Sequence, residues 1–404
     1  MNIEDKTKLE NYSIHDYYNP TKKFNAYLWT SAYALANMLY LFFIKKYNQN
    51  DILQFIDKVH KQLGTHSQNS SNLSTTIKPR LVWFNDLSKK SKSSKKSKSS
   101  NKSKSSNKSK SSKEFDILKF KKDLILGTLR IGKAEQNLTE GIYMHYLTKW
   151  VHVLMKTAIL CKTPILFCQA CHIMFTSCEI LKNKKNNTFP RKATENLIEP
   201  HPEPNEISHD PLDVFIILSY LEKYVGQFKF KYKHKYIVLL RKHIVELFNT
   251  RIIHYNQVHL STIDELGIGF LLVSIYKLIN LNRNVIDPAL IETLLNNIIE
   301  TSLQSLDRLI KSYNNTIPNS MVFRKCGVSI GLGLLKKLIN SEIPSEIKLI
   351  NITKYRLERF NPYFKYIDLY HESFEKSFNN DDWNSHRDIN TVMYLVSKNP
   401  DFMA

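Results

Sequence analysis

The sequence is poor in glycine, with 10 in 404 residues. It lacks the Gly-rich strings GxxxxGK[ST] and GxGxxG, which argues against a phosphate-binding loop or a dinucleotide fold. HExxH, the protein-kinase signatures and an Asp-rich metal loop are also missing. We therefore expect no enzyme activity, no cofactor and no metal ion, and the scarcity of turn-forming glycine favours a mostly helical protein.

A secretory leader is not expected, because the first residues, Met1–Asp5, are polar and acidic. One uncharged run, Phe24–Ile44, is long enough to span a bilayer. It contains Asn25 and Asn37, and its apolar residues recur at helical spacing. We interpret this run as a buried helix, with a membrane span as the alternative.

Cysteine is also scarce, and four of the five cluster as C-x6-C-x2-C-x6-C at Cys161, Cys168, Cys171 and Cys178. This spacing differs from the paired CxxC halves of structural zinc sites. Pro164 is expected to open a helix that carries the last three cysteines on one face. Small buried side chains are the favoured interpretation, and a metal or redox site is the alternative. An odd count without a leader indicates free thiols in a reducing compartment.

Positive charge is abundant but uneven. The net charge is +21, and residues 88–113 consist of 11 Lys, 13 Ser and 2 Asn. This Lys/Ser tract repeats KKSKSS and NKSKSS and has nothing to bury, so it is expected to be a low-complexity linker. The alternative is a tract for nuclear import or RNA contact that phosphorylation would switch.

Helical periodicity dominates the rest of the chain. Two helices are expected within 22–64, and a proline-rich loop insert is expected at 182–211. Further helices are predicted at 212–226, 234–254, 263–281, 288–313, 322–340 and 343–357. The segment Phe228–Tyr236 alternates aromatic residues with lysine, which fits an exposed loop or edge strand with one apolar side, or a strip on which nucleic acid stacks.

Two successive segments resemble a known helical family. Tyr146–Pro164 is an apolar helix ending in a proline turn, and Ile165–Phe175 is an alanine-containing helix ending in phenylalanine. This pattern resembles the first two helices of a cyclin box, above all in the transcriptional cyclins of the L, K and T kind. Downstream, 213–223 is similar to the third helix of a box, 264–281 to the fifth, and 326–335 to the small-residue central helix of a second box.

The resemblance implies an all-α fold of two cyclin-box-like five-helix bundles. The expected organisation is an N-terminal extension with helices at 1–87, the linker at 88–113, a first box at 114–286 with the loop insert at 182–211, and a second box with a C-terminal tail at 287–404. The function implied is that of a divergent cyclin, a regulatory subunit that binds and activates a cyclin-dependent protein kinase. Its setting would be transcription, mRNA processing or the cell cycle.

A cyclin-like subunit favours one conformer of its kinase and supplies no catalytic residue. The resemblance implies charged contacts at Lys223 and Glu265, with packing support from Ile217, Leu221 and Leu271. In the alternative register Tyr224 and Leu272 take the two positions, and the charged pair is lost. The expected location is nuclear, with cytoplasm also open. The alternative functions are a cyclin-fold transcription factor that contacts RNA or DNA through the Lys/Ser tract, and a helical scaffold without a kinase partner. A membrane partner is not expected.

Overall fold

The protein is described by a computed structural model in which residues 28–44, 47–66, 126–128, 142–178, 189, 192–193, 209–230, 233–281, 285–314, 316–318, 320–340, 349–377 and 380–404 are placed. These residues are predominantly helical, which confirms the all-α class. The strands among them form two short antiparallel pairs, β1 (Gly64–His66) with β2 (Leu126–Thr128) and β3 (Ile142–Tyr143) with β4 (Lys192–Ala193).

The helices alternate along the chain between two layers. The longer ones are α3 (Leu28–Phe43), α4 (Gln49–Leu63), α7 (Met144–Leu160), α8 (Pro164–Thr176), α9 (Asp210–Val225), α10 (Lys233–Thr250), α12 (Glu265–Ile279), α13 (Pro288–Ser312), α14 (Val322–Asn340), α15 (Leu349–Glu358), α16 (Lys365–Lys376) and α18 (Arg387–Lys398). The shorter ones are η2 (Ile252–His254), α11 (Gln257–Leu260), η3 (Asn361–Tyr363), α17 (Asp381–Ser385) and η4 (Pro400–Met403).

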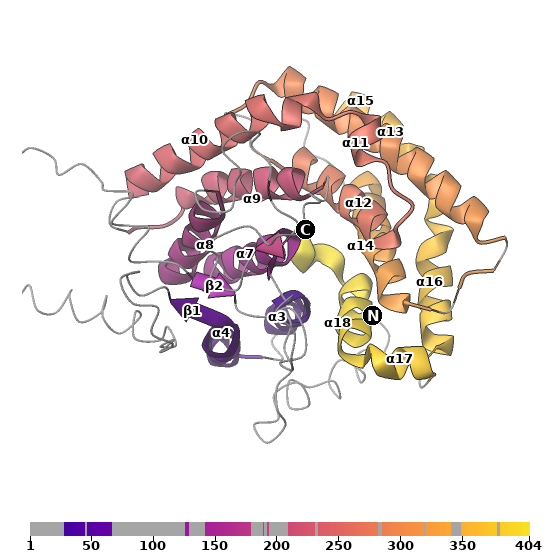
Figure 1. The fold of residues 1–404 in the computed structure, drawn as a ribbon, viewed down its shortest axis with the longest axis horizontal. Coiled ribbons are helices and arrows are strands. Elements are labelled where there is room, and N and C mark those ends of the chain that lie inside the picture. The colour runs from indigo at the N-terminus through magenta and orange to yellow at the C-terminus, as the bar shows by residue number, and fades with distance from the viewer. Residues whose placement is uncertain are drawn as a thin grey trace, which may run out of the picture.

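The inner layer is a closed ring of helices. Each of α3, α7, α9, α12, α14 and α18 packs on the next, and α18 packs back on α3, where the Asn37 side chain donates to the Val392 carbonyl at 3.3 Å (Figure 1). The ring explains why α3 and α9 are buried on almost every side and carry no solvated stripe.

The ring helices run parallel, as their contacts show. Near their starts, Trp29 of α3 lies 5.7 Å from His145 of α7, and Lys149 of α7 pairs with Asp213 of α9. Near their ends, the Tyr220 hydroxyl of α9 donates to the Lys277 carbonyl of α12 at 3.1 Å. The ring therefore has one mouth formed by helix N-termini and an opposite mouth formed by helix C-termini.

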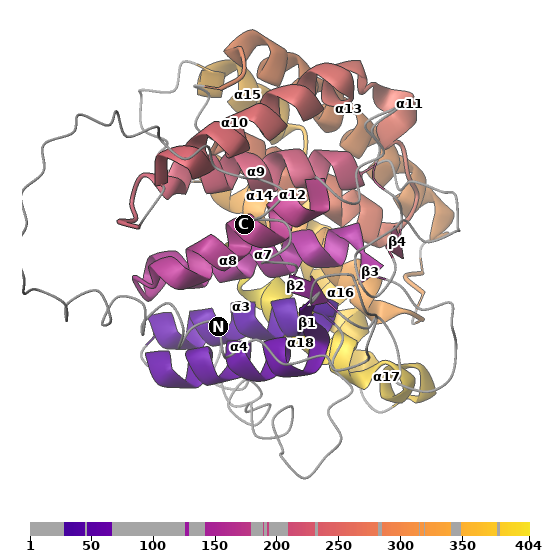
Figure 2. The same cartoon turned by 60° about the vertical axis from the view of Figure 1, so that its left-hand side comes forward.

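The outer helices cover the ring. Helix α4 packs on α3, α8 on α7, α10 on α9, α13 on α12 and α16 on α14, and each returns the chain to the next inner helix (Figures 1 and 2). The C-terminal turn η4 lies inside the ring, against α3, α7, α14 and α18. Residues from nearly the whole described chain thus share one apolar core.

Local sequence sets several helix starts. Asp264 caps α12 by accepting the Gly267 amide at 3.0 Å, and Asp287 caps α13 by accepting the Ala289 amide at 2.9 Å. Pro164 opens α8, as its position in the sequence predicts. The predicted helices at 212–226, 263–281, 288–313 and 322–340 match α9, α12, α13 and α14 closely.

Helices α12 and α14 approach unusually closely because glycines face each other. A Cβ atom built on Gly269 would lie 2.2 Å from the carbonyl carbon of Gly327, and one on Gly331 would lie 2.4 Å from the Leu272 Cβ. This pair joins residues on either side of the expected boundary at 286/287. The packing is one ring, and it does not confirm two separate five-helix bundles.

The described helices of the N-terminal extension do not form a separate lobe. Helix α3 closes the ring between α7 and α18, and α4 covers it from outside. Within the described residues, none of the helices combines the length and the apolar character needed to cross a bilayer. The Lys/Ser tract at 88–113 and most of the loop insert at 182–211 lie outside the described residues.

Candidate functional site

A pocket of about 450 Å³ lies at the N-terminal mouth of the ring. It collects residues that are far apart in the sequence because the ring helices begin there together. All six ring helices or the residues just before them contribute to its wall. The lining residues are Trp29, Tyr143, His145, Tyr146, His209, Asp210, Thr262, Asp264, Leu266, Gly267, Phe270, Phe323, Arg324 and Ile389.

Aromatic rings form much of the pocket wall. Trp29 lies 5.3 Å from Tyr146, and Tyr146 lies 5.1 Å from Tyr143, measured between ring centroids. Across the pocket, Phe270 is stacked on the His209 imidazole at 5.8 Å with an angle of 4° between the rings. Aromatic side chains with a few polar groups among them are typical of sites that bind organic ligands.

Asp210 is the most deeply buried charged residue of the wall, with 1% of its surface exposed. Its Oδ1 atom lies 3.3 Å from Nδ1 of His145, which is itself 22% exposed. Its Oδ2 atom is buried and has no hydrogen-bond partner among the described residues. A buried acceptor without a partner costs about 1–3 kcal/mol, so this oxygen is suited to a ligand that donates a hydrogen bond.

The Nε1 atom of Trp29 is also buried without a hydrogen-bond partner among the described residues, whereas Asp264 and His209 are engaged. Asp264 caps α12 and forms an ion pair with Arg324. The His209 Nε2 donates to the Leu260 carbonyl at 3.1 Å, and burial lowers the pKa of His209, so its imidazole is neutral at pH 7. The Asp210 Oδ2 atom is therefore the acceptor of the described wall that a donor on a ligand can orient itself on.

A buried charged layer lies beneath the pocket, towards the centre of the ring. Lys149 lies 3.0 Å from Asp213, and its ammonium stands 4.1 Å from the Phe270 centroid. Thr148 also donates to Asp213. A small cavity of about 30 Å³, lined by Trp29, Lys149 and Phe270 among others, connects this layer with the pocket wall, and it has room for a water molecule.

Further along α12, Lys277 is fully buried and its Nζ atom has no hydrogen-bond partner among the described residues. Burial, with Lys149 and Lys156 nearby, lowers the pKa of Lys277 from 10.5 to about 7. Between pH 7 and 10.5 the unfolded chain therefore binds a proton that the folded chain does not, and stability rises with pH in this window.

We expect Lys277→Met to raise the free energy of unfolding at pH 7 by about 1–3 kcal/mol, because an apolar side chain of similar length replaces an unpaired buried ammonium. The gain should shrink as the pH approaches 10. Urea unfolding of both proteins at pH 7, 8.5 and 10 measures this difference. An equal or growing gain in stability at high pH would contradict the lowered pKa of Lys277.

The structure does not bring together the two charged residues expected to contact a kinase. Lys223 lies at the C-terminal mouth, where its Nζ donates to the Asn280 carbonyl at 2.5 Å. Glu265 lies at the N-terminal mouth, where it accepts from the Tyr313 hydroxyl at 3.3 Å and lies 3.9 Å from Lys325. The two sit at opposite ends of the parallel helices α9 and α12.

The remaining predicted contact residues lie inside the protein. Ile217, Leu221 and Leu271 are almost completely buried in the ring, so they can support packing but present no surface. The alternative position Leu272 is also buried. Tyr224, the other alternative, is partly exposed at the C-terminal mouth, where the Lys223 ammonium stands 5.3 Å from its ring.

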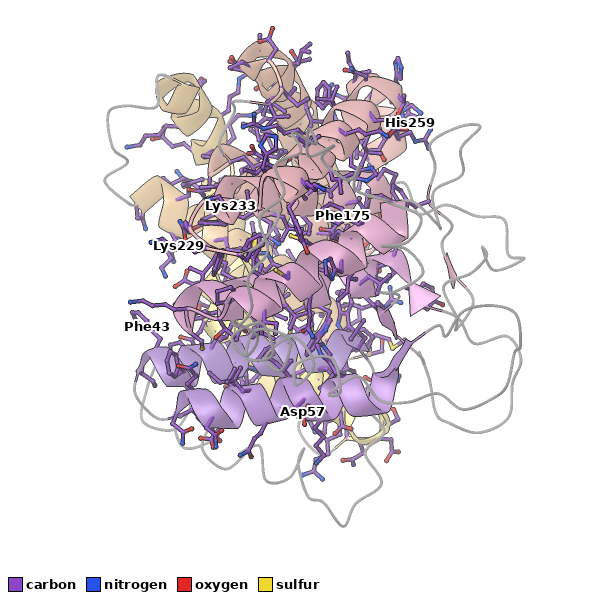
Figure 3. The ribbon with its side chains drawn as sticks, turned by 90° about the vertical axis from the view of Figure 1, so that its left-hand side faces the viewer. Phe43, Asp57, Phe175, Lys229, Lys233 and His259 are labelled. Carbon is purple, nitrogen blue, oxygen red and sulfur yellow. The ribbon has the colours of Figure 1, made fainter. Side chains whose placement is uncertain are left out.

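The structure also places two further candidates from the sequence, the cysteine cluster and the aromatic–lysine segment. Cys161, Cys171 and Cys178 are buried, Cys168 is partly buried, and none of the four is in a disulfide. The described residues include no cluster suited to a metal ion. In the aromatic–lysine segment, Phe228 and Phe230 pack inwards on Phe167. Lys229 and Lys233 lie near each other in Figure 3, outside this packing, which favours the loop with one apolar side.

Residues 327–331 spell Gly-x-Ser-x-Gly, the pattern of a serine-hydrolase nucleophile elbow. Such an elbow is a sharp turn between a strand and a helix that exposes the serine. Here Ser329 is completely buried in the middle of α14, and the two glycines serve the contact with α12. The pattern therefore does not have the structure that the chemistry requires.

Asp210, His145 and Trp29 carry no functional signal in the sequence alone. Asp210 falls at the edge of the proline-rich loop insert, and His145 and Trp29 fall in segments that were assigned to packing. The available signal was His209-Asp210-Pro211 just before an apolar helix, which is typical of a helix N-terminus. That signal marks the start of α9 but says nothing of the pocket around it.

Comparison with known proteins gives no relative. No protein-family description, no curated protein and no solved structure matches this chain. The argument for function therefore rests on the pocket itself.

Proposed function

We propose that this chain is a ligand-binding protein whose binding site is the pocket at the N-terminal mouth of the helical ring. The observation that carries the proposal is the buried, unpartnered Asp210 Oδ2 in the wall of an aromatic pocket of about 450 Å³. A pocket of this size accepts an organic group of roughly the bulk of a large side chain or a small metabolite.

The surroundings of the pocket support recognition by a rigid site. Its walls come from the first turns of long, buried helices, which hold side chains more firmly than loops do. The Trp29–Tyr146–Tyr143 contacts fix one wall, and the cap and ion pair of Asp264 fix the opposite one. Binding should therefore need little rearrangement of the ring.

A variant that fills the pocket tests this proposal. Ile389, in the first turn of α18, lines the pocket and is partly buried, so Ile389→Trp should occupy the space that a ligand needs. We expect a screen of small organic compounds by thermal shift to find ligands that stabilise the natural protein and that lose at least tenfold in affinity for the variant.

The matched control is Val258→Trp, which places the same side chain at a position that is 84% exposed and does not line the pocket. It should bind every ligand as the natural protein does. If ligands of the natural protein bind Ile389→Trp equally well, while the variant unfolds as the control does, the pocket is not the binding site.

The kinase-regulator role implied by the cyclin resemblance stays a separate prediction, as do the nucleic-acid alternative and the nuclear location. Affinity capture of the tagged chain from its native cells, with nuclease, tests these roles. A stoichiometric protein kinase whose retention is lost in Lys223→Glu and in Glu265→Lys would support the predicted contacts. Retention of that kinase by both variants would contradict them.

A further inference from the structure

We infer that the ligand presents an organic cation with N–H donors, an ammonium or guanidinium on an apolar stem, to Asp210. This inference rests on the proposed function and names the chemical class of its ligand. It follows from the donors and acceptors of the pocket wall, the charges that face the pocket and the aromatic surface beside Asp210.

The unpartnered oxygen of Asp210 calls for a donor on the ligand, whereas the other unpartnered polar atom of the described lining residues, Trp29 Nε1, is itself a donor. A carboxylate only accepts hydrogen bonds, and the Oδ2 atom of Asp210 accepts none from the described residues. A ligand that brought another acceptor would leave this oxygen unsatisfied and add repulsion in a site shielded from water. An N–H or O–H group of the ligand is therefore required at this point of the wall.

The charges that face the pocket favour a cation among the possible donors. The residues concerned are Asp210 and Asp264, the imidazoles of His145 and His209, and Arg324. Arg324 is neutralised by Asp264, and His209 is neutral because burial lowers its pKa. In the layer beneath, the Lys149 charge is paired with Asp213. Among the described residues of the wall, Asp210 is the one with a carboxylate oxygen that is not already engaged.

Aromatic faces beside a carboxylate strengthen this preference. A cation over an aromatic ring is attracted by the negative face of the ring, and more strongly the further it is removed from water. Trp29, Tyr146 and Phe323 belong to the same wall as Asp210. The fold already uses this contact at the pocket floor, where the Lys149 ammonium stands over Phe270.

An anion is the competing occupant, because helix N-termini attract negative charge. At α12 and α14 the N-terminal amides are, however, already used by side chains of the protein, whereas the starts of α7 and α18 carry no side-chain cap. Asp264 accepts the Gly267 amide, and the Asn390 side chain accepts the Phe323 amide at 3.1 Å. At the start of α9, Asp210 itself supplies the negative charge. An anionic ligand would meet occupied amides at α12 and α14 and a buried carboxylate at α9.

The experiment measures calorimetric affinities of the full chain for four probes. They are 2-phenylethylammonium, its N,N,N-trimethyl analogue, 3-phenylpropanoate and N-acetyl-lysinamide. The trimethyl analogue keeps the charge but has no N–H donor, and the carboxylate reverses the charge. Tighter binding of phenylethylammonium indicates a free amine as the natural ligand, and tighter binding of N-acetyl-lysinamide indicates a lysine side chain of a peptide.

We expect at least one of the two primary ammonium probes to bind, the trimethyl analogue at least fivefold more weakly than phenylethylammonium, and the carboxylate not at all. Asp210→Asn should weaken ammonium binding at least tenfold, and the exposed control Asp307→Asn should leave it unchanged. His145→Gln removes the imidazole that pairs with Asp210, so it should strengthen ammonium binding. This second variant keeps the inference testable if Asp210→Asn folds poorly.

The inference is overturned if 3-phenylpropanoate binds as well as the ammonium probes, if the trimethyl analogue binds equally well, or if ammonium binding is unchanged in Asp210→Asn and not strengthened in His145→Gln. It is also overturned if no ammonium probe binds while other compounds bind in a way that Ile389→Trp abolishes. In that last case the proposed function still holds, so the two failures are distinguishable.

Discussion

Replacing Gly269 by alanine should lower the free energy of unfolding by about 3 kcal/mol or more, the upper end of what overpacking costs. The added Cβ would lie 2.2 Å from the Gly327 carbonyl carbon and 2.7 Å from the Val328 amide nitrogen. Both atoms belong to the backbone of α14, so no side chain can move aside. Helices α12 and α14 would have to separate, and the ring would open at its tightest contact.

The control for this prediction is Gly333→Ala, in the same helix α14. A Cβ at Gly333 meets only a Pro400 carbon at an ordinary 3.5 Å. This change should leave stability unchanged or raise it by up to about 1 kcal/mol, because alanine is the better helix former. Urea unfolding of the natural protein and both variants measures the contrast. If Gly269→Ala is as stable as Gly333→Ala, the close packing of α12 on α14 is wrong.

Asp213→Asn should cost about 3–5 kcal/mol of stability, the usual result of removing one partner of a buried ion pair. Asp213 and Lys149 are both almost completely buried, so the variant leaves the Lys149 ammonium without a counter-charge inside the ring. The loss of the carboxylate also removes an acid that acts on Lys277, whose buried Nζ atom has no hydrogen-bond partner among the described residues.

The matched control is Asp401→Asn, which breaks the exposed ion pair with Lys337. Exposed pairs contribute about 0–1 kcal/mol, so this variant should unfold close to the natural protein. The double variant Asp213→Asn with Lys149→Met should recover much of the loss, because it removes the stranded charge. Equal stability of the two single variants would contradict a buried ion pair between α7 and α9.

Much of the helical content could be predicted because periodicity and caps act locally. The predicted segment at 322–340 coincides with α14, and Asp287-Pro288 marks the start of α13 as an N-cap followed by proline should. Helix α15 overlaps the predicted helix at 343–357, of which residues 343–348 lie outside the described part of the chain. The C-terminal helices α16 and α18 were not singled out, although they form part of the packing.

The closed ring could not be predicted from the same local signals. Its helices are buried on most sides, so their apolar residues do not form a narrow stripe that would identify a partner. The uncharged α3 therefore fitted both a core helix and a membrane span. The glycines of 327–333 indicated close helix approach, but only the structure shows that Gly327 meets Gly269 of α12.

The pocket escaped prediction for a related reason. Its wall joins Trp29, His145, Asp210, Phe323 and Ile389, which lie in five helices spread over most of the chain. No spacing rule links such residues, since they meet only when the ring closes and its helices start at one mouth. Lys223 and Glu265 are separated for the same geometric reason. Lys223 lies at the end of α9 and Glu265 at the start of α12, and because these helices run parallel, the two residues lie at different mouths.

The most direct test of this account is a crystal structure of the full chain grown with 2-phenylethylammonium. The account predicts a closed ring with the ammonium nitrogen within hydrogen-bond distance of the Asp210 Oδ2 and the phenyl group among the aromatic residues of the pocket. A pocket filled by another segment of the chain, or a ligand bound elsewhere with Asp210 still unpartnered, would contradict it.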